Sequence, residues 1–427
     1  MNKKILLVYP HNFLERKMGV DSRFYGLITY FKTRNIEVDL FALKNFVSSW
    51  DKQDLQEKGL IDELFFYDFA EGRRQGKRKG KKWPLRFLKQ KVSGDVKFAE
   101  LPDYAFDGMK KKFLQILAAK QYDFVIISYV YWAGLIEPRP AKNCRIILDL
   151  SDFTTLNLFD MTAGKIDTGV LLGEEIRRVN LFDDVLCISA EEQWFFSQFA
   201  KNPYYYYIPF FLKKGSLDKK NPKNDKDKYE SKDKDKNKKY DLLFVGSDNP
   251  FNKEGIDWFL KEVFPLLSAP LNILVVGKVT AHVREQGYET GNSGSTGNKN
   301  VKCIPFAADL GDVYRQTKIA LCPLLGGTGI KIKVIEALAY ELPVVTTPKG
   351  VTGFPSKAGN GCLVADTPQE FADQVSRLLS DGNFYNEQSR QARQYFREHF
   401  EESRVYKQLD HIFLSPGEIR RSREKGE

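Results

Sequence analysis

Residues 321–347 constrain the fold of this chain more than any other stretch. An apolar run over 319–325 predicts a buried strand, and the glycine-rich residues 326–329 follow it. Apolar residues three and four positions apart then predict a helix over 330–340, after which a second short apolar strand begins. This succession of strand, glycine turn, helix and strand predicts a parallel α/β unit.

The predicted helix carries two lysines, Lys331 and Lys333, in its first turn. This end of a helix favours negative charge, because its backbone N–H groups give it a partial positive charge. A bound anion would offset the repulsion, and the preceding glycines leave N–H groups accessible, which favours a phosphate or diphosphate. Such lysines are also typical of a solvated helix face, and glycine turns occur in most α/β proteins.

Glu336 lies further along the same helix. It follows Gly329 by seven residues, which at about 1.5 Å per residue places it roughly 10 Å along the helix axis. That separation suits a ribose when a diphosphate is bound at the helix start. The loop is neither a Walker A motif, since no Gly-Lys-Ser/Thr follows, nor a dinucleotide fingerprint, since the third glycine is missing.

Three segments resemble the donor-site signature of the bacterial family-4 retaining glycosyltransferases (glycosyl transferases group 1), which have the GT-B fold. They are Gly-Thr-Gly-Ile-Lys-Ile-Lys-Val-Ile-Glu-Ala-Leu-Ala at 327–339, Leu-Pro-Val-Val-Thr-Thr at 342–347 and Gly-Val-Thr-Gly at 350–353. The resemblance implies an α/β protein with two Rossmann-like domains facing an interdomain cleft. It also implies that a sugar is transferred from a nucleoside diphosphate sugar to an acceptor hydroxyl with retained anomeric configuration.

The resemblance also implies roles for individual residues. The diphosphate is expected to contact the glycine loop and the helix start, at Gly327, Thr328, Gly329, Ile330, Lys331 and Lys333. The ribose is expected on Glu336. Other loops that face the donor in this family correspond here to Gly19, Ser247, Asn252 and Lys253. We interpret Glu336 and Asp152 as the candidates for catalysis.

Two departures from the family pattern concern how the sugar is held. Family members usually have Asp-x-His-Asp after one strand of the first domain, and Ser151 replaces that histidine here, which leaves Asp149 and Asp152 as the ionisable candidates. Both aspartates are also typical of helix caps and turns. Family members often carry two glutamates eight positions apart, and Thr328 replaces the first of them. These departures leave the sugar that is transferred open.

Composition restricts the partners and the cofactors. The net charge of +10 and the pI near 9.0 indicate acidic partners such as nucleotides, anionic lipid or nucleic acid, of which we expect nucleotides and not nucleic acid. Five widely spaced cysteines and four histidines without ligand-like spacing predict no metal, cofactor or disulfide. No apolar run approaches about eighteen residues, so a cytoplasmic protein is expected.

Residues 73–91 mix lysine and arginine with aromatic and apolar side chains. This composition is typical of peripheral contact with an anionic membrane at its inner face, of a nucleic-acid contact, or of a solvated loop. We favour the membrane surface, because many related enzymes use lipid-linked acceptors.

The chain is too long for one ordinary domain. We predict an acceptor-side Rossmann-like domain over 1–208, a lysine-rich linker over 209–239 and a nucleotide-sugar-binding domain over 240–385. Residues 386–427 are expected to form a helix that returns to the first domain, followed by a tail.

The sequence thus predicts a metal-independent retaining hexosyltransferase that acts on a glycan or lipid-linked acceptor in the synthesis of cell-surface glycans or glycolipids. Two alternatives remain open. A nucleotide-sugar epimerase can share the fold, and would need acid and base residues in the cleft. A catalytically inactive relative, acting as a binding partner or scaffold, is suggested by Ser151 and Thr328.

Overall fold

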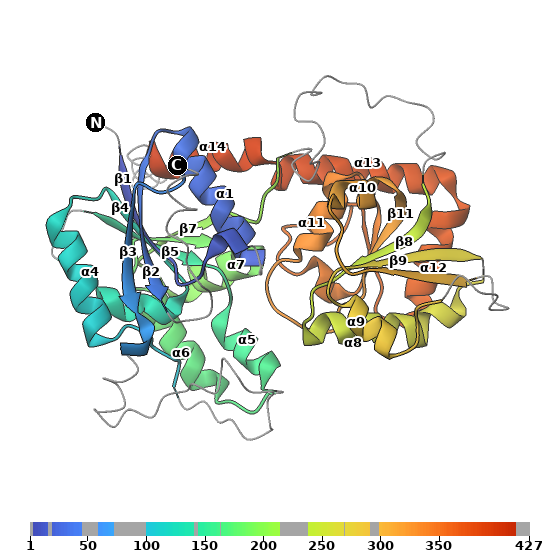
Figure 1. Cartoon of the computed structure of the whole chain (residues 1–427), viewed down its shortest axis with the longest axis horizontal. Coiled ribbons are helices and arrows are strands. Elements are labelled where there is room, and N and C mark those ends of the chain that lie inside the picture. Colours follow the sequence, from blue (N-terminus) through green and yellow to red (C-terminus); the bar gives the residue numbers. More distant parts are fainter. Residues whose placement is uncertain are drawn as a thin grey trace. The chain divides into compact units, whose positions relative to one another are not determined.

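The computed structural model describes residues 3–15, 19–44, 59–71, 100–140, 144–162, 164–213, 238–268, 270–290 and 299–415. The basic segment 73–91 and most of the lysine-rich linker lie outside these residues. The chain divides into two compact units, residues 1–208 and 209–427, each built on its own sheet (Figure 1).

The sheet of the first unit has the strand order β3-β2-β1-β4-β5-β6-β7 in the described part of the chain, and each neighbouring pair is parallel. The strands are β1 Lys4–Val8, β2 Glu37–Lys44, β3 Glu63–Asp68, β4 Phe124–Ser128, β5 Arg145–Leu150, β6 Asp184–Cys187 and β7 Tyr204–Tyr207. Central strands such as β1 and β4 are continuous apolar runs, because both of their faces are covered.

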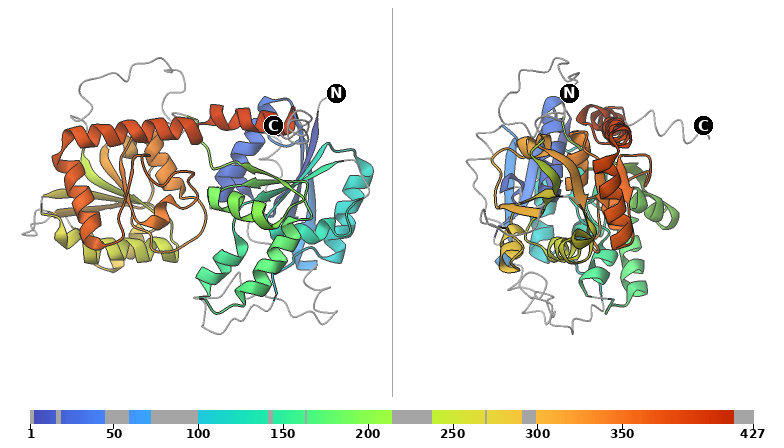
Figure 2. Two further views of the ribbon diagram at one scale, coloured as in Figure 1. Left: turned by 180° about the vertical axis from the view of Figure 1, so that it is seen from behind. Right: turned by 90° about the vertical axis from the view of Figure 1, so that its right-hand side faces the viewer.

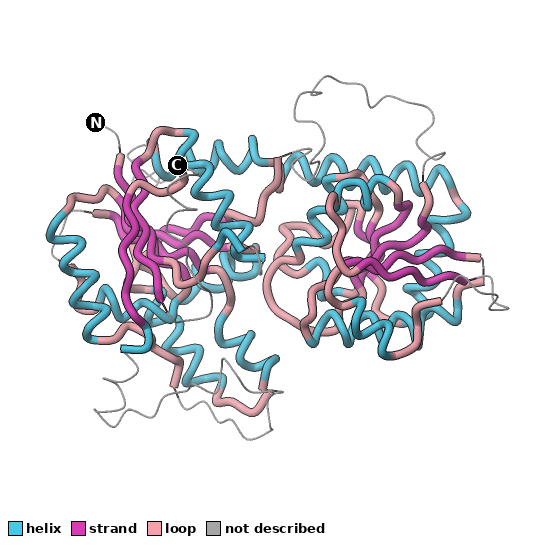
Figure 3. Tube along the Cα trace, in the orientation of Figure 1, coloured by secondary structure: helices cyan, strands magenta, loops and turns pink. Residues whose placement is uncertain are grey.

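Helices alternate with these strands and cover the sheet (Figures 2 and 3). They are α1 Gly19–Thr33, α4 Asp107–Ala119, α5 Thr154–Met161, α6 Thr168–Val179 and α7 Ala190–Phe199, with short 3-10 helices η1 Phe13–Glu15 and η3 Val130–Ile136. The start of α7 is fixed by a capping box, in which the side chains of Ser189 and Glu192 each accept the other's backbone N–H.

The sheet of the second unit has the order β10-β9-β8-β11-β12-β13 in the described residues and is also parallel. Its strands are β8 Tyr240–Val245, β9 Leu271–Val276, β10 Lys299–Ile304, β11 Thr317–Cys322, β12 Val344–Thr346 and β13 Cys362–Val364. The predicted strand over 319–325 was too long at its end. β11 stops at Cys322 because Pro323, which has no N–H, cannot continue the ladder.

The helices of this unit are α8 Pro250–Trp258, α9 Thr280–Glu285, α10 Leu310–Arg315, α11 Ile332–Ala339, α12 Pro368–Ser380, α13 Gly382–His399 and α14 Glu402–Phe413. A π turn over Phe259–Val263 and two 3-10 turns, Phe264–Leu266 and Pro348–Val351, complete it. None of the helices in the described ranges is long and apolar enough to cross a lipid bilayer.

The helix predicted after residue 386 is interrupted between α13 and α14. There Leu212 donates its N–H to the carbonyl of Phe400 at 3.0 Å and forms a parallel bridge with Glu401. The backbone therefore turns out of the helix at this point. The predicted return of this region to the first domain stays a prediction.

Candidate functional site

In the second unit, the loops after β8 and β11 leave the same edge of the sheet. The two strands are parallel neighbours, with Ala320 paired to Leu243, so the carboxyl ends of both strands lie side by side. In open parallel sheets, ligands bind at this edge. The structure therefore brings the predicted donor-binding residues of 247–253 and 327–336 together.

The glycine loop between β11 and α11 depends on its glycines. Gly327 and Gly329 have φ angles of 92° and 72°, which side chains disfavour. A Cβ atom on Gly326 would lie 2.9 Å from the ring of Phe251. The next residue, Ile330, is buried and packs against Gly353. The positive φ angles and the close contact with Phe251 therefore explain why this loop consists largely of glycine.

The sequence predicted Lys331 in the first turn of a helix, and this prediction was wrong. It is the residue before α11, with extended backbone (φ −93°, ψ 98°). Its ammonium donates to the carbonyl oxygens of Gly327, Thr328 and Gly329 at 3.0, 3.0 and 2.8 Å, and the residue is 8% exposed. The positive charge is therefore directed at the carbonyls of the loop.

Lys333, inside α11, connects the two loops. Its Nζ lies 2.6 Å from Oδ1 of Asn252 and 4.5 Å from the ring centroid of Phe244, and burial lowers the pKa of this ammonium. The amide nitrogen of Asn252 donates to the carbonyl and hydroxyl oxygens of Ser247, at 3.0 and 3.2 Å. Asn252 therefore joins the β8 loop to the start of α11.

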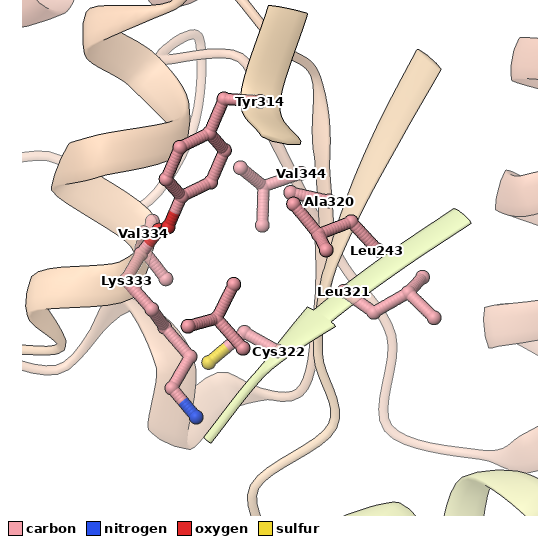
Figure 4. Close-up of a pocket in the computed structure, with 9 residues that line it drawn as sticks. Leu243, Tyr314, Ala320, Leu321, Cys322, Lys333, Val334 and Val344 are labelled. Atoms are coloured by element: carbon pink, nitrogen blue, oxygen red, sulfur yellow. Dashed lines mark hydrogen bonds between the residues drawn. The ribbon is translucent and has the colours of Figure 1, made fainter. Parts of the chain in front are cut away.

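A small cavity lies beside the side chain of Lys333 (Figure 4). Its volume is about 10 Å³, close to the minimum that one water molecule needs. Tyr314, Cys322, Val334 and other side chains from β8, β11, β12, α10 and α11 line it. Its size makes it part of the core packing and excludes it as a nucleotide site.

Glu336 faces Tyr314, a residue of α10 that the sequence analysis missed. The Tyr314 hydroxyl donates to Oε2 of Glu336 at 2.8 Å, and the Tyr314 ring stacks on Tyr340 with centroids 5.4 Å apart. Burial raises the pKa of Glu336 to about 7, although the hydrogen bond from Tyr314 opposes the shift. This carboxyl group therefore titrates near neutral pH. No spacing rule links Tyr314 to Glu336.

The loop after β8 owes its shape to asparagine side chains. Oδ1 of Asn249 accepts the N–H of Asn252 at 2.8 Å and caps α8, which starts at Pro250. Lys253 forms an ion pair with Asp248 at 2.5 Å, and both side chains are exposed. The predicted positive charge of Lys253 is therefore present at the surface next to a carboxylate.

In the first unit, the predicted residues Asp149 and Ser151 belong to a buried polar cluster at the end of β5. Asp149 is paired with Arg23 of α1, and its Oδ2 accepts hydrogen bonds from the hydroxyls of Ser128 and Ser151 at 3.2 and 3.1 Å. The Ser151 hydroxyl, at the position where the family that the sequence resembles has a histidine, therefore points at Asp149. These contacts give Asp149 a structural role as the partner of Arg23.

Asp152 lies just before α5 and accepts a hydrogen bond from the side chain of Asn157. It is not the cap of that helix. The buried carboxylate of Glu175, from α6, accepts the N–H groups of Thr154 and Thr155 at 2.8 Å each. Burial raises the pKa of Glu175 to about 7. Glu175 thus fixes the start of α5 directly after Asp152.

Gly19, the predicted glycine of the first unit, is the first residue of α1. Two residues later, Asp21 accepts a hydrogen bond from the hydroxyl of Tyr9 at 2.8 Å. This contact ties the start of α1 to the end of β1. The predicted donor contact of Gly19 stays a prediction.

Residues 239–381 match a family model described as "Glycosyl transferases group 1". The match includes β8 to β13 and both loops of the site in the second unit. It therefore covers the segments on which the predicted donor site was based.

A curated protein of Klebsiella pneumoniae, described as an uncharacterized 44.6 kDa protein in the cps region, is 24% identical over 173 residues. The aligned part covers 39% of this chain and 44% of that protein. The chain thus matches less than half the length of this relative.

Solved structures resemble nearly the whole chain. Sucrose-phosphate synthase from Thermosynechococcus elongatus matches with a TM-score of 0.63 at 13% identity, covering 97% of this chain and 99% of its own. Anabaena Alr3699/HepE, solved with UDP and glucose, matches with a TM-score of 0.63 at 14% identity, covering 97% and 100%. TarM from S. aureus has a TM-score of 0.62 at 13% identity, covering 97% and 99%. These matches confirm the predicted fold: an α/β protein with two Rossmann-like domains of the GT-B type.

Proposed function

We propose that this protein is a retaining glycosyltransferase that moves a sugar from a nucleoside diphosphate sugar to an acceptor hydroxyl. The observation that carries the proposal is the β11–α11 segment. It combines the glycine loop, Lys333 and Glu336 within the region that matches the group 1 family model. In the reaction, the bond from the anomeric carbon to the diphosphate breaks, a bond to the acceptor oxygen forms, and the acceptor hydroxyl loses its proton.

The donor would lie along the start of α11. Backbone N–H groups of the loop at Gly327 to Ile330 and the positive end of the helix suit the diphosphate, and the Glu336 carboxylate suits the ribose hydroxyls. Lys333, at the Asn252 bridge, would supply positive charge, with Ser247 and Lys253 on the neighbouring loop. Likeness to a protein solved with UDP and glucose makes UDP the first nucleotide to test.

Catalysis would consist mainly of stabilising the leaving diphosphate. Backbone N–H groups and an ammonium can do this without a metal ion, because they are aimed at the charge that develops on the leaving oxygen. In the first unit, we propose that Asp152 acts on the sugar or the acceptor and that Gly19 allows close approach of a substrate. The acceptor would be a glycan or a lipid-linked sugar of a cell-surface glycan, with residues 73–91 touching anionic membrane.

Calorimetry with UDP, GDP, ADP and CMP tests the donor site. We expect one nucleoside diphosphate to bind, and Glu336→Ala to weaken its binding by about 1–3 kcal/mol, because ribose hydroxyls lose a partner. Glu262→Ala, which removes an exposed carboxylate of the same unit, is the matched control. Absence of binding to all four nucleotides would refute the proposal.

Product analysis then tests the reaction. The donor sugar should appear on the acceptor with unchanged anomeric configuration, also in the presence of EDTA. Asp152→Asn should lower kcat and leave the Kd of the nucleotide unchanged. A changed sugar formed without any acceptor would indicate an epimerase, and an intact donor after long incubation would indicate an inactive relative.

A further inference from the structure

The Lys331 ammonium has an unusual set of partners. It has three N–H donors, and three backbone carbonyls, those of Gly327, Thr328 and Gly329, lie within 3.0 Å of its Nζ. The three carbonyls can therefore use all three donors. Because the residue is also buried, the contacts form inside the loop and not on its surface.

This arrangement decides where the N–H groups of the loop point. In a trans peptide the C=O and the following N–H point in opposite directions. The cis peptide bond among the described residues is Glu137–Pro138, so the peptides of this loop are trans. Because the carbonyls of 327, 328 and 329 converge on one ammonium, the N–H groups of Thr328, Gly329 and Ile330 point away from it. Successive N–H groups that face one side form a concave site for anions.

We propose that Lys331 is a positioning residue of the donor site. It is an internal cation that holds the glycine loop in the shape in which the N–H groups of 328–330 receive the diphosphate. It is thus not itself a ligand of the donor, in contrast to the prediction from the sequence. The proposal rests on the proposed function, because it assumes a diphosphate at this loop.

The physical reason is electrostatic. Three carbonyl oxygens that converge without a cation repel one another, and the left-handed angles of Gly327 and Gly329 leave those peptides free to rotate because no Cβ blocks them. Without the ammonium, at least one peptide would turn its oxygen toward the anion site. The loss would then affect anion binding as well as the order of the loop.

Two variants separate positioning from direct contact. Lys331→Met removes the charge, whereas Lys331→Arg keeps it but cannot aim three N–H groups at one point from a planar guanidinium. If Lys331 touched the diphosphate, arginine would preserve binding. If Lys331 positions the loop, both variants should have about 10- to 100-fold lower affinity for UDP, or for whichever nucleoside diphosphate binds the wild type. Lys302→Met, at an exposed lysine of β10, is the control.

A second measurement does not depend on any nucleotide. Amide hydrogen exchange in the peptide that covers residues 326–331 should be at least about tenfold faster in both variants, with unchanged exchange in β8 to β10. If Lys331→Met does not fold, Lys331→Arg and Lys331→Gln carry the comparison, with thermal unfolding as the check of their folded state.

The outcomes distinguish the two proposals. Wild-type affinity in Lys331→Arg, or unchanged exchange in the loop, would overturn the positioning role. If the wild type binds no nucleoside diphosphate although the variants exchange faster, the proposed function fails and only the ordering of the loop by Lys331 is supported.

Discussion

The guanidinium of Arg23 in α1 pairs with the carboxylate of Asp149 at the end of β5, and neither side chain is exposed to solvent. The same guanidinium donates to the carbonyl of Ile208, with Nη2 at 3.0 Å from the oxygen. One buried cation therefore connects the first helix, a central strand and the end of the first unit. A buried ion pair of this kind is stable only while both partners are present.

Asp149→Asn should therefore destabilise the first unit by about 3–5 kcal/mol, because it leaves a buried guanidinium without a counter-charge. Urea unfolding measures this loss. The double variant Arg23→Met with Asp149→Leu should lose less stability than Asp149→Asn alone, because it leaves no unpaired buried charge. Arg390→Met, at an exposed pair with Glu387, is the control and should leave the midpoint unchanged. A loss from Asp149→Asn as small as that of the control would contradict the role of the pair.

Glu175 should make the stability of the first unit depend on pH. Burial raises its pKa from 4.5 to about 7 in the folded chain, so the folded state holds this proton more tightly than the unfolded state. The contribution of the group is then complete below about pH 4 and is lost as the pH rises to about 7. Urea unfolding between about pH 4 and 8 should show wild type losing up to roughly 3 kcal/mol relative to Glu175→Gln. If the difference in unfolding free energy between wild type and Glu175→Gln stayed constant with pH, the predicted role of Glu175 would be contradicted.

If the donor site is as proposed, nucleotide affinity should rise as the pH increases through about 7, the pKa of Glu336. The ionised carboxylate accepts stronger hydrogen bonds from the ribose and Tyr314 than the protonated acid does. Tyr314→Phe should move this step to higher pH, because the hydroxyl stabilises the ionised form. Glu336→Gln should bind weakly without the step. Calorimetry across this pH range checks the prediction, and an unshifted step in Tyr314→Phe would contradict it.

Replacing two glycines by alanine, one packed against α13 and one at its start, should change the stability of the protein in opposite directions. Gly361 has a φ of 76°, and an added Cβ would lie 2.5 Å from the Cβ of Ala392 and 2.7 Å from its backbone, so Gly361→Ala should cost about 1–3 kcal/mol. Gly382 starts α13 and has open space around it. Gly382→Ala should stabilise by about 0.4–1 kcal/mol, because the unfolded chain loses freedom. Thermal unfolding of both variants measures these changes. A stabilising effect of Gly361→Ala would contradict the close contact between Gly361 and Ala392 of α13.

Local patterns in the sequence predicted most of the secondary structure. Continuous apolar runs identified the buried parallel strands, and the spacing of apolar residues identified the helices, because both depend on which faces of an element are covered. The glycine loop was also predictable, since the φ angles of Gly327 and Gly329 are a local property of the backbone. The errors were at the ends of elements. There, single residues such as Pro323 and Lys331 determine where a strand ends or a helix begins.

The sequence by itself thus determined the alternating strands and helices and the glycine loop, and it predicted which residues would meet a nucleotide. The tertiary structure decided what those residues touch. Lys333 reaches Asn252, Glu336 meets Tyr314 and Arg23 meets Asp149, over separations of 81, 22 and 126 residues. Such contacts depend on which strands become neighbours and how the helices pack on them. No periodicity along the chain records that information, because it arises only when distant segments bury their apolar faces together.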